Sequence, residues 1–144
     1  MLTIALPKGR IADETLDRFE KAFGEKFVFE DRKLILEKSG FKFLNVRNQD
    51  VPTYVMHGAA DLGVVGLDVL EEKEYDLIKL LDLKLGRCKV AFGLRAGEKL
   101  NFDKSKITIA TKHEKIAKKY FEQKAMAVEI IKLYGSIELA PLVG

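Results

Sequence analysis

The chain has 144 residues, of which 47% are hydrophobic and 33% charged, and its formal net charge is 25 − 22 = +3. This composition excludes disordered, collagen-like and low-complexity classes, and the length allows a hydrophobic core without disulfide support. The single cysteine excludes a disulfide framework, and no Cys/His cluster has the spacing of a zinc site. No apolar run approaches the roughly 20 residues that span a bilayer, and the first ten residues lack the pattern of a signal peptide. We therefore expect a cytoplasmic globular protein without a membrane partner or a metal site of its own.

Residues 96–144 supply the whole net positive charge, because they contain nine basic and six acidic side chains, whereas residues 1–95 are neutral. Most of these lysines fall between residues 112 and 124. A nucleic-acid-binding protein typically shows a denser basic stripe with interleaved aromatic residues. A solvated lysine-rich helix face is the better interpretation, so we expect no nucleic-acid partner.

The first half of the chain predicts alternating strands and helices. Residues 2–6 form an apolar run that predicts a buried strand, stopped by Pro7. Apolar residues at helical spacing from Ala12 to Phe23 predict a helix that Gly24 closes. Two β-rich runs, 34–36 and 41–44, flank a Ser-Gly pair and predict a hairpin.

Asp50 precedes Val51 and Pro52, a pattern that predicts a helix start with the Asp50 side chain as its N-cap. The following segments predict, in order, a strand at 61–66, a short helix at 67–74, an extended return at 76–83 and a strand at 86–94.

The last third predicts a cleaner βαβ unit. Strands are expected at 107–110 and 128–133, and Thr111 is expected to cap the helix between them. A further helix is expected to begin at Ile137. Strands that alternate with helices favour an α/β fold with mostly parallel sheets. The polar stretch from 96 to 106 predicts a crossover between two lobes, 1–95 and 96–144. The apolar ending at Gly144 predicts that the chain continues beyond it.

Lys8, Gly9 and Arg10 form the turn between the first strand and the first helix. Ligands of open α/β sheets bind beyond the carboxyl ends of strands, where helix N-termini attract anions. Glycine allows the backbone to approach a phosphate, and the flanking cations supply charge. The alternative is an ordinary turn with two solvated cations. Arg47 follows another expected strand, and there it would hold a phosphate bidentately.

Gly135, Ser136 and Glu138 follow the last expected strand. This turn offers backbone amides and a hydroxyl to a ligand. Glu138 would contact a sugar or base, or it would only stabilise the positive start of a helix. Nothing in the sequence suggests a catalytic triad or a carboxylate pair, so any chemistry should depend on electrostatics and positioning.

Taken in order, several segments resemble one family, ATP phosphoribosyltransferase. They are residues 6–10 (LPKGR), 47–54 (RNQDVPTY), 57–66 (HGAADLGVVG), 85–88 (LGRC), 109–112 (IATK) and 135–141 (GSIELAP). The resemblance covers essentially the whole chain, and the two longer blocks are specific. It implies an α/β fold of two lobes similar to type II periplasmic binding proteins, with a ligand cleft between the lobes.

The resemblance also implies an activity. The family joins N1 of the adenine of ATP to C1 of phosphoribosyl diphosphate and releases diphosphate, with Mg²⁺, in the first step of histidine biosynthesis. Carried over by position, Lys8, Gly9 and Arg10 would lie against the nucleotide or its phosphates. Arg47 would hold phosphate and the departing diphosphate, with Arg32 as a further helper. The turn at 135–138 would contribute from the second lobe.

The resemblance is closer to the short form of the family, which implies a homodimer and a hetero-oligomer with a subunit related to histidyl-tRNA synthetase. In the family, the loop that binds the ribose phosphate follows the GSIE block. The present sequence ends before that loop, so we expect a C-terminally incomplete chain with little activity of its own. The alternative function is a non-catalytic module of the same fold that binds a phosphate or nucleotide. Such a module would have no need for phosphate-binding residues at both Lys8–Arg10 and Arg47.

Overall fold

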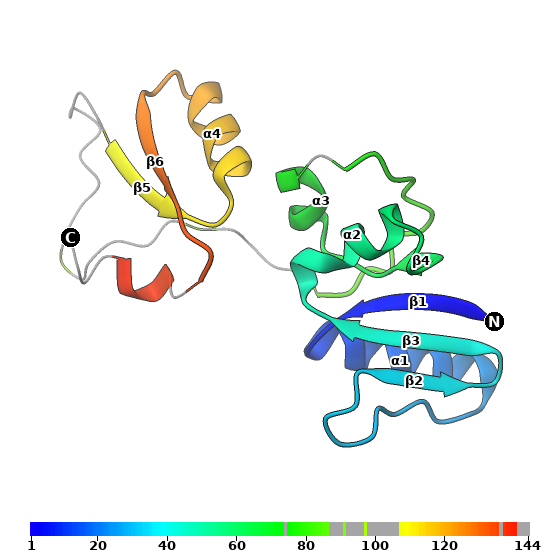
Figure 1. Cartoon of the computed structure of the whole chain (residues 1–144). Helices are drawn as coiled ribbons and strands as arrows, with labels where there is room; N and C mark the ends of the chain where they lie inside the picture. Colours follow the sequence, from blue (N-terminus) through cyan, green and yellow to red (C-terminus); the bar gives the residue numbers. More distant parts are fainter. Residues whose placement is uncertain (74, 87–90, 92–96, 98–106, 136, 141–144) are drawn as a thin grey trace. The chain divides into compact units, whose positions relative to one another are not determined.

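The computed structural model describes residues 1–144 except 74, 87–90, 92–96, 98–106, 136 and 141–144 (Figure 1). The chain divides into two compact units. The first comprises Met1–Leu70 and Glu74–Arg87, and the second comprises Glu71–Lys73 and Cys88–Gly144. In the part of the chain that is described, no helix has the length and apolar character needed to cross a bilayer.

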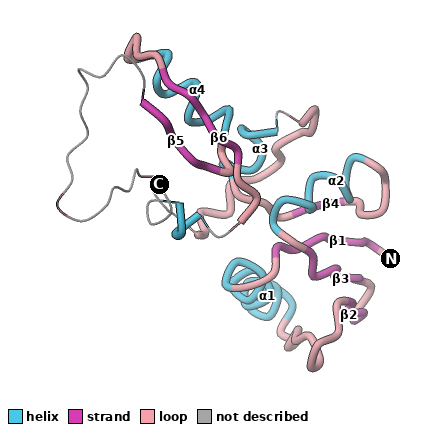
Figure 2. The backbone as a smooth tube through the Cα atoms, turned by 60° about the vertical axis from the view of Figure 1, so that its left-hand side comes forward, coloured by secondary structure: helices cyan, strands magenta, loops and turns pink. Residues whose placement is uncertain are grey.

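The first unit is built on a four-stranded sheet in the order β2-β3-β1-β4 (Figure 2). Its strands are β1 (Leu2–Pro7), β2 (Ile35–Lys38), β3 (Phe41–Val46) and β4 (Leu62–Gly63). β1 pairs in parallel with β3 and β4, whereas β2 and β3 form the antiparallel hairpin expected from the sequence. The mixed, mostly parallel α/β arrangement confirms the predicted fold class. β4 is shorter than the strand predicted at 61–66.

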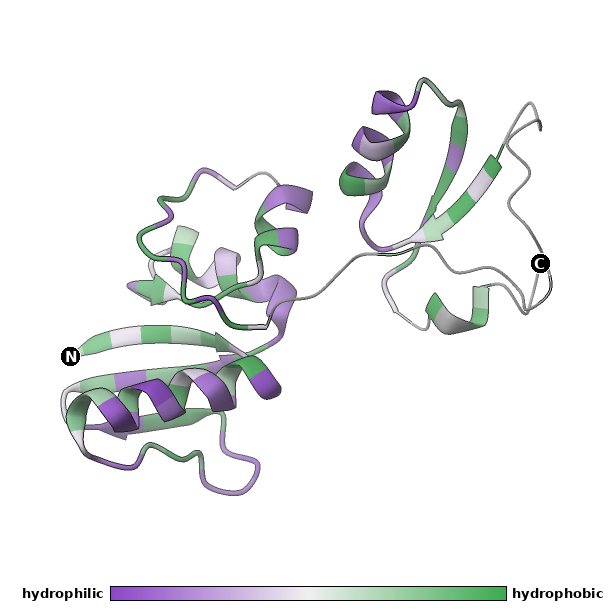
Figure 3. Cartoon of the chain, turned by 180° about the vertical axis from the view of Figure 1, so that it is seen from behind, coloured by the Kyte–Doolittle hydropathy of each residue, from purple (hydrophilic) through white to green (hydrophobic). Residues whose placement is uncertain are grey.

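Helix α1 (Arg10–Phe23) packs on the sheet through its apolar stripe. Ala12, Thr15 and Leu16 are buried, and Gly24 ends the helix in a left-handed conformation, as predicted. The polar residues of α1 lie on the side away from the sheet (Figure 3). Phe23, at the end of the stripe, is 54% exposed because it lies beyond the well-covered part of the core.

A cluster of phenylalanines joins α1 to the hairpin. The ring centroid of Phe19 lies 5.0 Å from that of Phe43, 5.2 Å from that of Phe41 and 5.9 Å from that of Phe27. Phe43 and Phe27 are buried, with 0% and 3% of their surface exposed. Each such edge-to-face pair contributes about 0.5–1.5 kcal/mol beyond the burial of its area. The cluster therefore fixes the hairpin against the helix.

A second core cluster lies beneath the segment that follows β3. A one-turn 3₁₀ helix, η1 (Asn48–Asp50), leads directly into α2 (Val51–Met56), and Val51 packs with Ala5 and Ala60. Gly63 in β4 allows a close approach, because a Cβ atom there would lie 2.7 Å from a methyl group of Val51. α3 (Leu67–Lys73) follows, as predicted.

The segment 76–83, expected as an extended return, belongs to no strand of the described sheets. Its apolar side chains Ile78, Leu80 and Leu81 are 74–86% exposed. The strand predicted at 86–94 and the crossover predicted at 96–106 lie almost wholly outside the described residues. The expected lobe boundary between residues 95 and 96 lies there too, so it stays a prediction.

The second unit contains the predicted βαβ element. β5 (Ile107–Thr111) and β6 (Val128–Lys132) pair in parallel, and α4 (Glu114–Gln123) connects them. Ala117 and Phe121 on α4 are buried, as is Ile107 on β5. Tyr120 was expected on the apolar stripe but is 42% exposed. η2 (Ile137–Leu139), a single 3₁₀ turn, begins where a new helix was expected.

The start of α4 is capped by a residue that the sequence pattern did not indicate. The buried carboxylate of Glu72 accepts hydrogen bonds from the backbone N–H groups of Lys115 (2.8 Å) and Ile116 (3.0 Å). These are two of the donors that the first turn of a helix leaves without a partner. The hydroxyl oxygen of the predicted cap, Thr111, instead accepts from the N–H of His113 at 2.9 Å, and Thr111 lies two residues before His113, which occupies the N-cap position of α4. The prediction for Thr111 is therefore wrong.

Candidate functional site

The carboxyl ends of β1 and β3 lie side by side and bring two of the predicted site segments together. Pro7, the last residue of β1, is paired with Val46, the last residue of β3. The backbone N–H of Lys8 extends this pairing by donating to the Val46 carbonyl oxygen at 2.8 Å. The Lys8–Arg10 turn and Arg47 therefore start from neighbouring positions at one edge of the sheet, where open α/β folds bind ligands.

Gly9 adopts a backbone conformation that other residues rarely use. Its φ is 108° and its ψ is −149°, and it occupies the N-cap position of α1. A Cβ atom at Gly9 would meet nothing within 4 Å, so the requirement for glycine is conformational rather than steric. The turn is exposed and leaves room for a ligand to approach the backbone at the first turn of α1.

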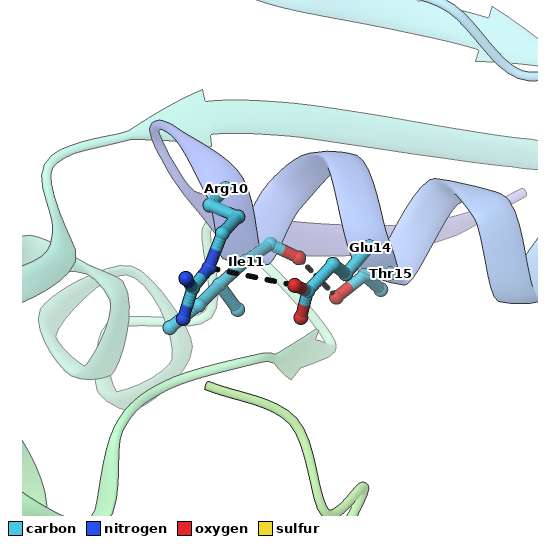
Figure 4. Close-up of polar contacts among 4 residues, drawn as sticks. All are labelled: Arg10, Ile11, Glu14 and Thr15. Atoms are coloured by element: carbon cyan, nitrogen blue, oxygen red, sulfur yellow. Dashed lines mark hydrogen bonds and ion pairs between the residues drawn. The ribbon is translucent and has the colours of Figure 1, made fainter. Parts of the chain in front are cut away.

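Arg10 begins α1 and points along its first turn (Figure 4). Its Nε atom lies 3.4 Å from Oε1 of Glu14, one helical turn later. Because the Arg10 side chain is 74% exposed, this pair contributes less than about 1 kcal/mol to stability. Beside it, the buried Thr15 hydroxyl donates to the Ile11 carbonyl oxygen at 2.7 Å. The first turn is thus well ordered, while the Arg10 guanidinium remains accessible to an anion.

Arg47 leaves β3 in an extended conformation, with φ −64° and ψ 142°, and its side chain is exposed. Its carbonyl oxygen accepts from the N–H of Asp50 at 2.9 Å, which closes the η1 turn. Asp50 makes no side-chain capping hydrogen bond. The prediction that Asp50 caps α2 is therefore wrong, because η1 precedes α2 directly and Asp50 is already helical, with φ −92° and ψ −16°.

Arg32 lies in the exposed turn before β2, at the same edge of the sheet. The carbonyl oxygen of Leu34 accepts from the N–H of Asn45 at 2.8 Å, which extends the β2–β3 pairing towards the carboxyl end of β3. Arg32 has a left-handed backbone with φ 59°. Such a conformation costs a non-glycine residue about 1–2 kcal/mol, and strain of this kind often occurs at functional sites.

The turn that contains Arg32 is closed by its neighbours. The N–H of Lys33 donates to the Glu30 carbonyl oxygen at 3.0 Å, and the Lys33 ammonium also contacts the Glu30 carboxylate. The hydrogen bond and the positive charge of Lys33 lower the pKa of Glu30. The Glu30 carboxylate therefore has Lys33 as its ion-pair partner in this turn.

Two asparagines near Arg47 were given no role on the basis of the sequence, although Asn48 belongs to the 47–50 segment that the sequence pointed to. The side-chain Oδ1 atoms of Asn45 and Asn48 are buried and have no hydrogen-bond partner among the described residues. A buried acceptor without a donor costs about 1–3 kcal/mol. No sequence pattern signals them, because their burial depends on the packing of β3 and η1.

The second unit contains the remaining predicted site residues. Gly135 is exposed and follows β6. Ser136 lies outside the described residues, and Glu138 belongs to η2, with a side chain that is also not described. The structure therefore brings together the candidates of the first unit, Lys8, Gly9, Arg10, Arg32 and Arg47, at one sheet edge. Within the described ranges, no group of three or more His, Cys, Asp or Glu side chains could hold a metal ion.

Comparisons with known proteins agree on one family. The sequence model of the ATP phosphoribosyltransferase (HisG) family matches residues 47–144. The chain is 71% identical over 144 residues to an ATP phosphoribosyltransferase of Wolinella succinogenes, and 66% identical to one of Sulfurovum sp.. In both cases the match covers the whole chain and 70% of the relative.

A solved structure agrees with the sequence matches. It is described as the ATP phosphoribosyl transferase (HisG:HisZ) complex from Thermotoga maritima, and it aligns with a TM-score of 0.69 and 34% identity. The alignment covers all of the present chain and 70% of that chain, and it confirms the periplasmic-binding-protein-like fold. The chain therefore belongs to the ATP phosphoribosyltransferase family, the pentosyltransferases that catalyse the first step of histidine biosynthesis.

Proposed function

We propose that the sheet edge formed by Lys8–Arg10, Arg32 and Arg47 binds the phosphate groups of the two substrates, ATP and phosphoribosyl diphosphate. The observation that supports this most is the pairing of Pro7 with Val46, continued by the hydrogen bond from Lys8 to Val46. Two cationic turns therefore follow adjacent strand ends, and we assign one turn to each substrate.

The chemistry of the reaction requires positively charged groups that bind phosphates, but no catalytic base. The lone pair of adenine N1 forms a bond to C1 of phosphoribosyl diphosphate, the C1–O bond breaks, and the bonding pair leaves with diphosphate. N1 is a neutral nucleophile, so no strong base is required. The protein must orient two polyanions and stabilise the negative charge that develops on the departing diphosphate.

We assign roles to the residues of the first unit on this basis. Arg47 holds a phosphate of phosphoribosyl diphosphate and the departing diphosphate, because guanidinium groups bind such oxygens bidentately. Arg32 assists from the neighbouring turn. Lys8, Gly9 and Arg10 hold the nucleotide or its phosphates, with Gly9 allowing the close backbone approach. An incoming phosphate would replace Glu14 as the partner of Arg10.

We propose binding roles for three residues of the second unit as well. Gly135 and Ser136 follow β6 and offer a backbone amide and a hydroxyl to the substrates. Glu138 contacts a sugar or base. The support for these three residues is their position after a parallel strand and their match to the GSIE block of the family.

We propose Mg²⁺ as the metal ion that the family uses. It enters with the substrate phosphates, since polyphosphates bind Mg²⁺ with few protein ligands. By analogy with the Thermotoga maritima complex, we also propose a hetero-oligomer with a HisZ-like subunit related to histidyl-tRNA synthetase, together with a homodimer of the catalytic chain. The substrates are cytosolic metabolites, so we expect a cytoplasmic enzyme.

The test is the formation of phosphoribosyl-ATP by the full-length protein with saturating Mg²⁺, with and without the synthetase-like subunit. We expect Arg47→Ala to lower kcat by about 10²-fold, the usual effect of removing one group that stabilises developing charge. Arg47→Lys should recover part of this loss, because it keeps the charge without the bidentate geometry. Arg18→Ala, an exposed arginine in the middle of α1, is the matched control and should stay within twofold.

Two results would contradict the proposal. Equal effects of Arg47→Ala and Arg18→Ala would mean that Arg47 contributes only general charge. ATP binding without any product from the wild-type protein, even with the second subunit, would favour a non-catalytic binding module.

A further inference from the structure

Tyr134 is the most exposed aromatic residue of the described chain and has no packing role. It lies two residues after the end of β6, and it is 82% exposed. The ammonium group of Lys132 lies over its ring, 5.5 Å from the centroid. A tyrosine in such a position exposes a large apolar surface to water and gains only a cation–π contact of about 0.5–1 kcal/mol. The ring is therefore available to a ligand.

Two of the three other exposed aromatic residues of the described part pack against neighbouring rings. Phe23 stacks on Phe19 with a centroid distance of 5.8 Å, and Tyr120 on α4 packs edge-on against Phe121 at 5.2 Å. Tyr54, on α2, is 38% exposed, less than half as much as Tyr134. Tyr134 differs from all three, because it follows the carboxyl end of a parallel strand.

The backbone holds Tyr134 close to that strand end. Lys132 is the last residue of β6 and pairs with Thr111, the last residue of β5. The N–H of the next residue, Leu133, donates to the Thr111 carbonyl oxygen at 2.9 Å, so the pairing continues by one residue. Tyr134 comes immediately afterwards and precedes Gly135 of the proposed binding turn. Parallel sheets bind their ligands in this region.

We propose that the ring of Tyr134 stacks on the adenine base of ATP, with Lys132 on the opposite face of the tyrosine. This inference rests on the proposed function, which supplies ATP as the ligand. Stacking suits the reaction, because the lone pair of N1 lies in the plane of the adenine ring. A contact with the face of the base holds adenine in place and leaves the reacting edge free. Tyr134 is thus a substrate-contacting residue that selects for a planar base.

The experiment measures the dissociation constant of ATP by isothermal titration calorimetry with the full-length protein. Stacking of a base on an aromatic ring contributes about 1–3 kcal/mol, so Tyr134→Ala should weaken ATP binding by about fivefold to 150-fold. Tyr134→Phe keeps the stacking surface and should stay within about twofold of the wild type. Tyr120→Ala, which removes a different exposed and lysine-paired tyrosine, is the matched control and should not change ATP affinity.

Inorganic tripolyphosphate separates base stacking from phosphate binding. Its affinity should be the same in the wild type, Tyr134→Ala and Tyr134→Phe, since it has no base. Equal ATP affinity in the wild type and Tyr134→Ala would overturn the stacking and leave the proposed function intact. A Tyr134→Phe variant as weak as Tyr134→Ala would also overturn it, because the hydroxyl rather than the ring would then matter. Failure of the wild type to bind ATP would overturn both this inference and the proposed function.

Discussion

The two units place their candidate residues by different means. In the first unit, β1 is paired on both sides, and the phenylalanine cluster fixes α1 and the hairpin around it. In the second, the described sheet has two strands under one helix, and that helix begins on the carboxylate of Glu72, 43 residues earlier in the sequence than Lys115. In the first unit, strand register positions the candidate residues at the ends of β1 and β3. In the second unit, a long-range cap by Glu72 stabilises α4, which precedes the strand that leads to the candidate residues.

The largest effect should come from the core of the first unit. Phe43→Ala removes a side chain with no exposed surface from the centre of the cluster, and should lower the free energy of unfolding by about 3–5 kcal/mol. Phe23→Ala, in the same cluster but 54% exposed, should cost far less. Urea unfolding followed by circular dichroism measures both. Equal losses would show that the cluster is not the core that holds the hairpin.

Gly63→Ala tests the close packing of β4 on α2. The added Cβ would lie 2.7 Å from Val51 Cγ1 and 2.9 Å from Val55 Cγ2, and overpacking of this kind costs about 1–3 kcal/mol. Gly135→Ala, where an added Cβ meets nothing within 4 Å, should leave the free energy of unfolding almost unchanged. An unchanged free energy of unfolding in Gly63→Ala would mean that the packing of α2 on β4 adjusts to the added methyl group without cost.

Glu72→Ala tests the second unit. It removes the acceptor of two N–H groups at the start of α4 and should cost about 0.5–2 kcal/mol, as the loss of a helix cap does. The amide hydrogens of Lys115 and Ile116 should exchange faster with solvent. Glu71→Ala, an exposed neighbour on α3, serves as the control. Unchanged exchange in Glu72→Ala would show that other groups satisfy these donors.

The smallest effect concerns the turn that contains Arg32. Because Lys33 lowers the pKa of Glu30, the stabilising contact is present above the ordinary carboxyl pKa and is lost as the pH falls through the lowered value. Lys33→Met should return the pKa of Glu30 to its usual range. The side-chain carboxyl carbon shift of Glu30, followed by NMR from pH 2 to 7, reports this. An unchanged titration would contradict the pairing.

Local patterns were enough for the elements that form within one stretch of sequence. The Leu2–Leu6 run, the spacing that ends at Gly24 and the Ser39-Gly40 turn each predicted an element that the structure confirms. Contacts between distant residues were not predictable in this way. Nothing near Thr111 indicates that Glu72 caps α4, and nothing in the Asp50-Val51-Pro52 pattern indicates that η1 makes the Asp50 cap unnecessary.

For the candidate site, too, residue types were predictable from the sequence and contacts between distant segments were not. The Lys8–Arg10 turn and Arg47 were identified separately, because residue types and strand ends are visible in the sequence. Their proximity depends on the register that pairs Pro7 with Val46, and it became apparent only with the sheet. The buried oxygens of Asn45 and Asn48 depend on packing in three dimensions and had no sequence signal.

The most direct test of the central claim is a double-mutant cycle between Lys8 and Arg47, measured as kcat/KM for phosphoribosyl-ATP formation by the full-length protein. If the two turns hold the phosphates of both substrates in one site, the effects of Lys8→Ala and Arg47→Ala are not additive, and the coupling energy should be at least about 0.5 kcal/mol. If they belong to separate sites, the losses add to within about 0.3–0.5 kcal/mol. Additive losses would contradict a single phosphate site at the ends of β1 and β3.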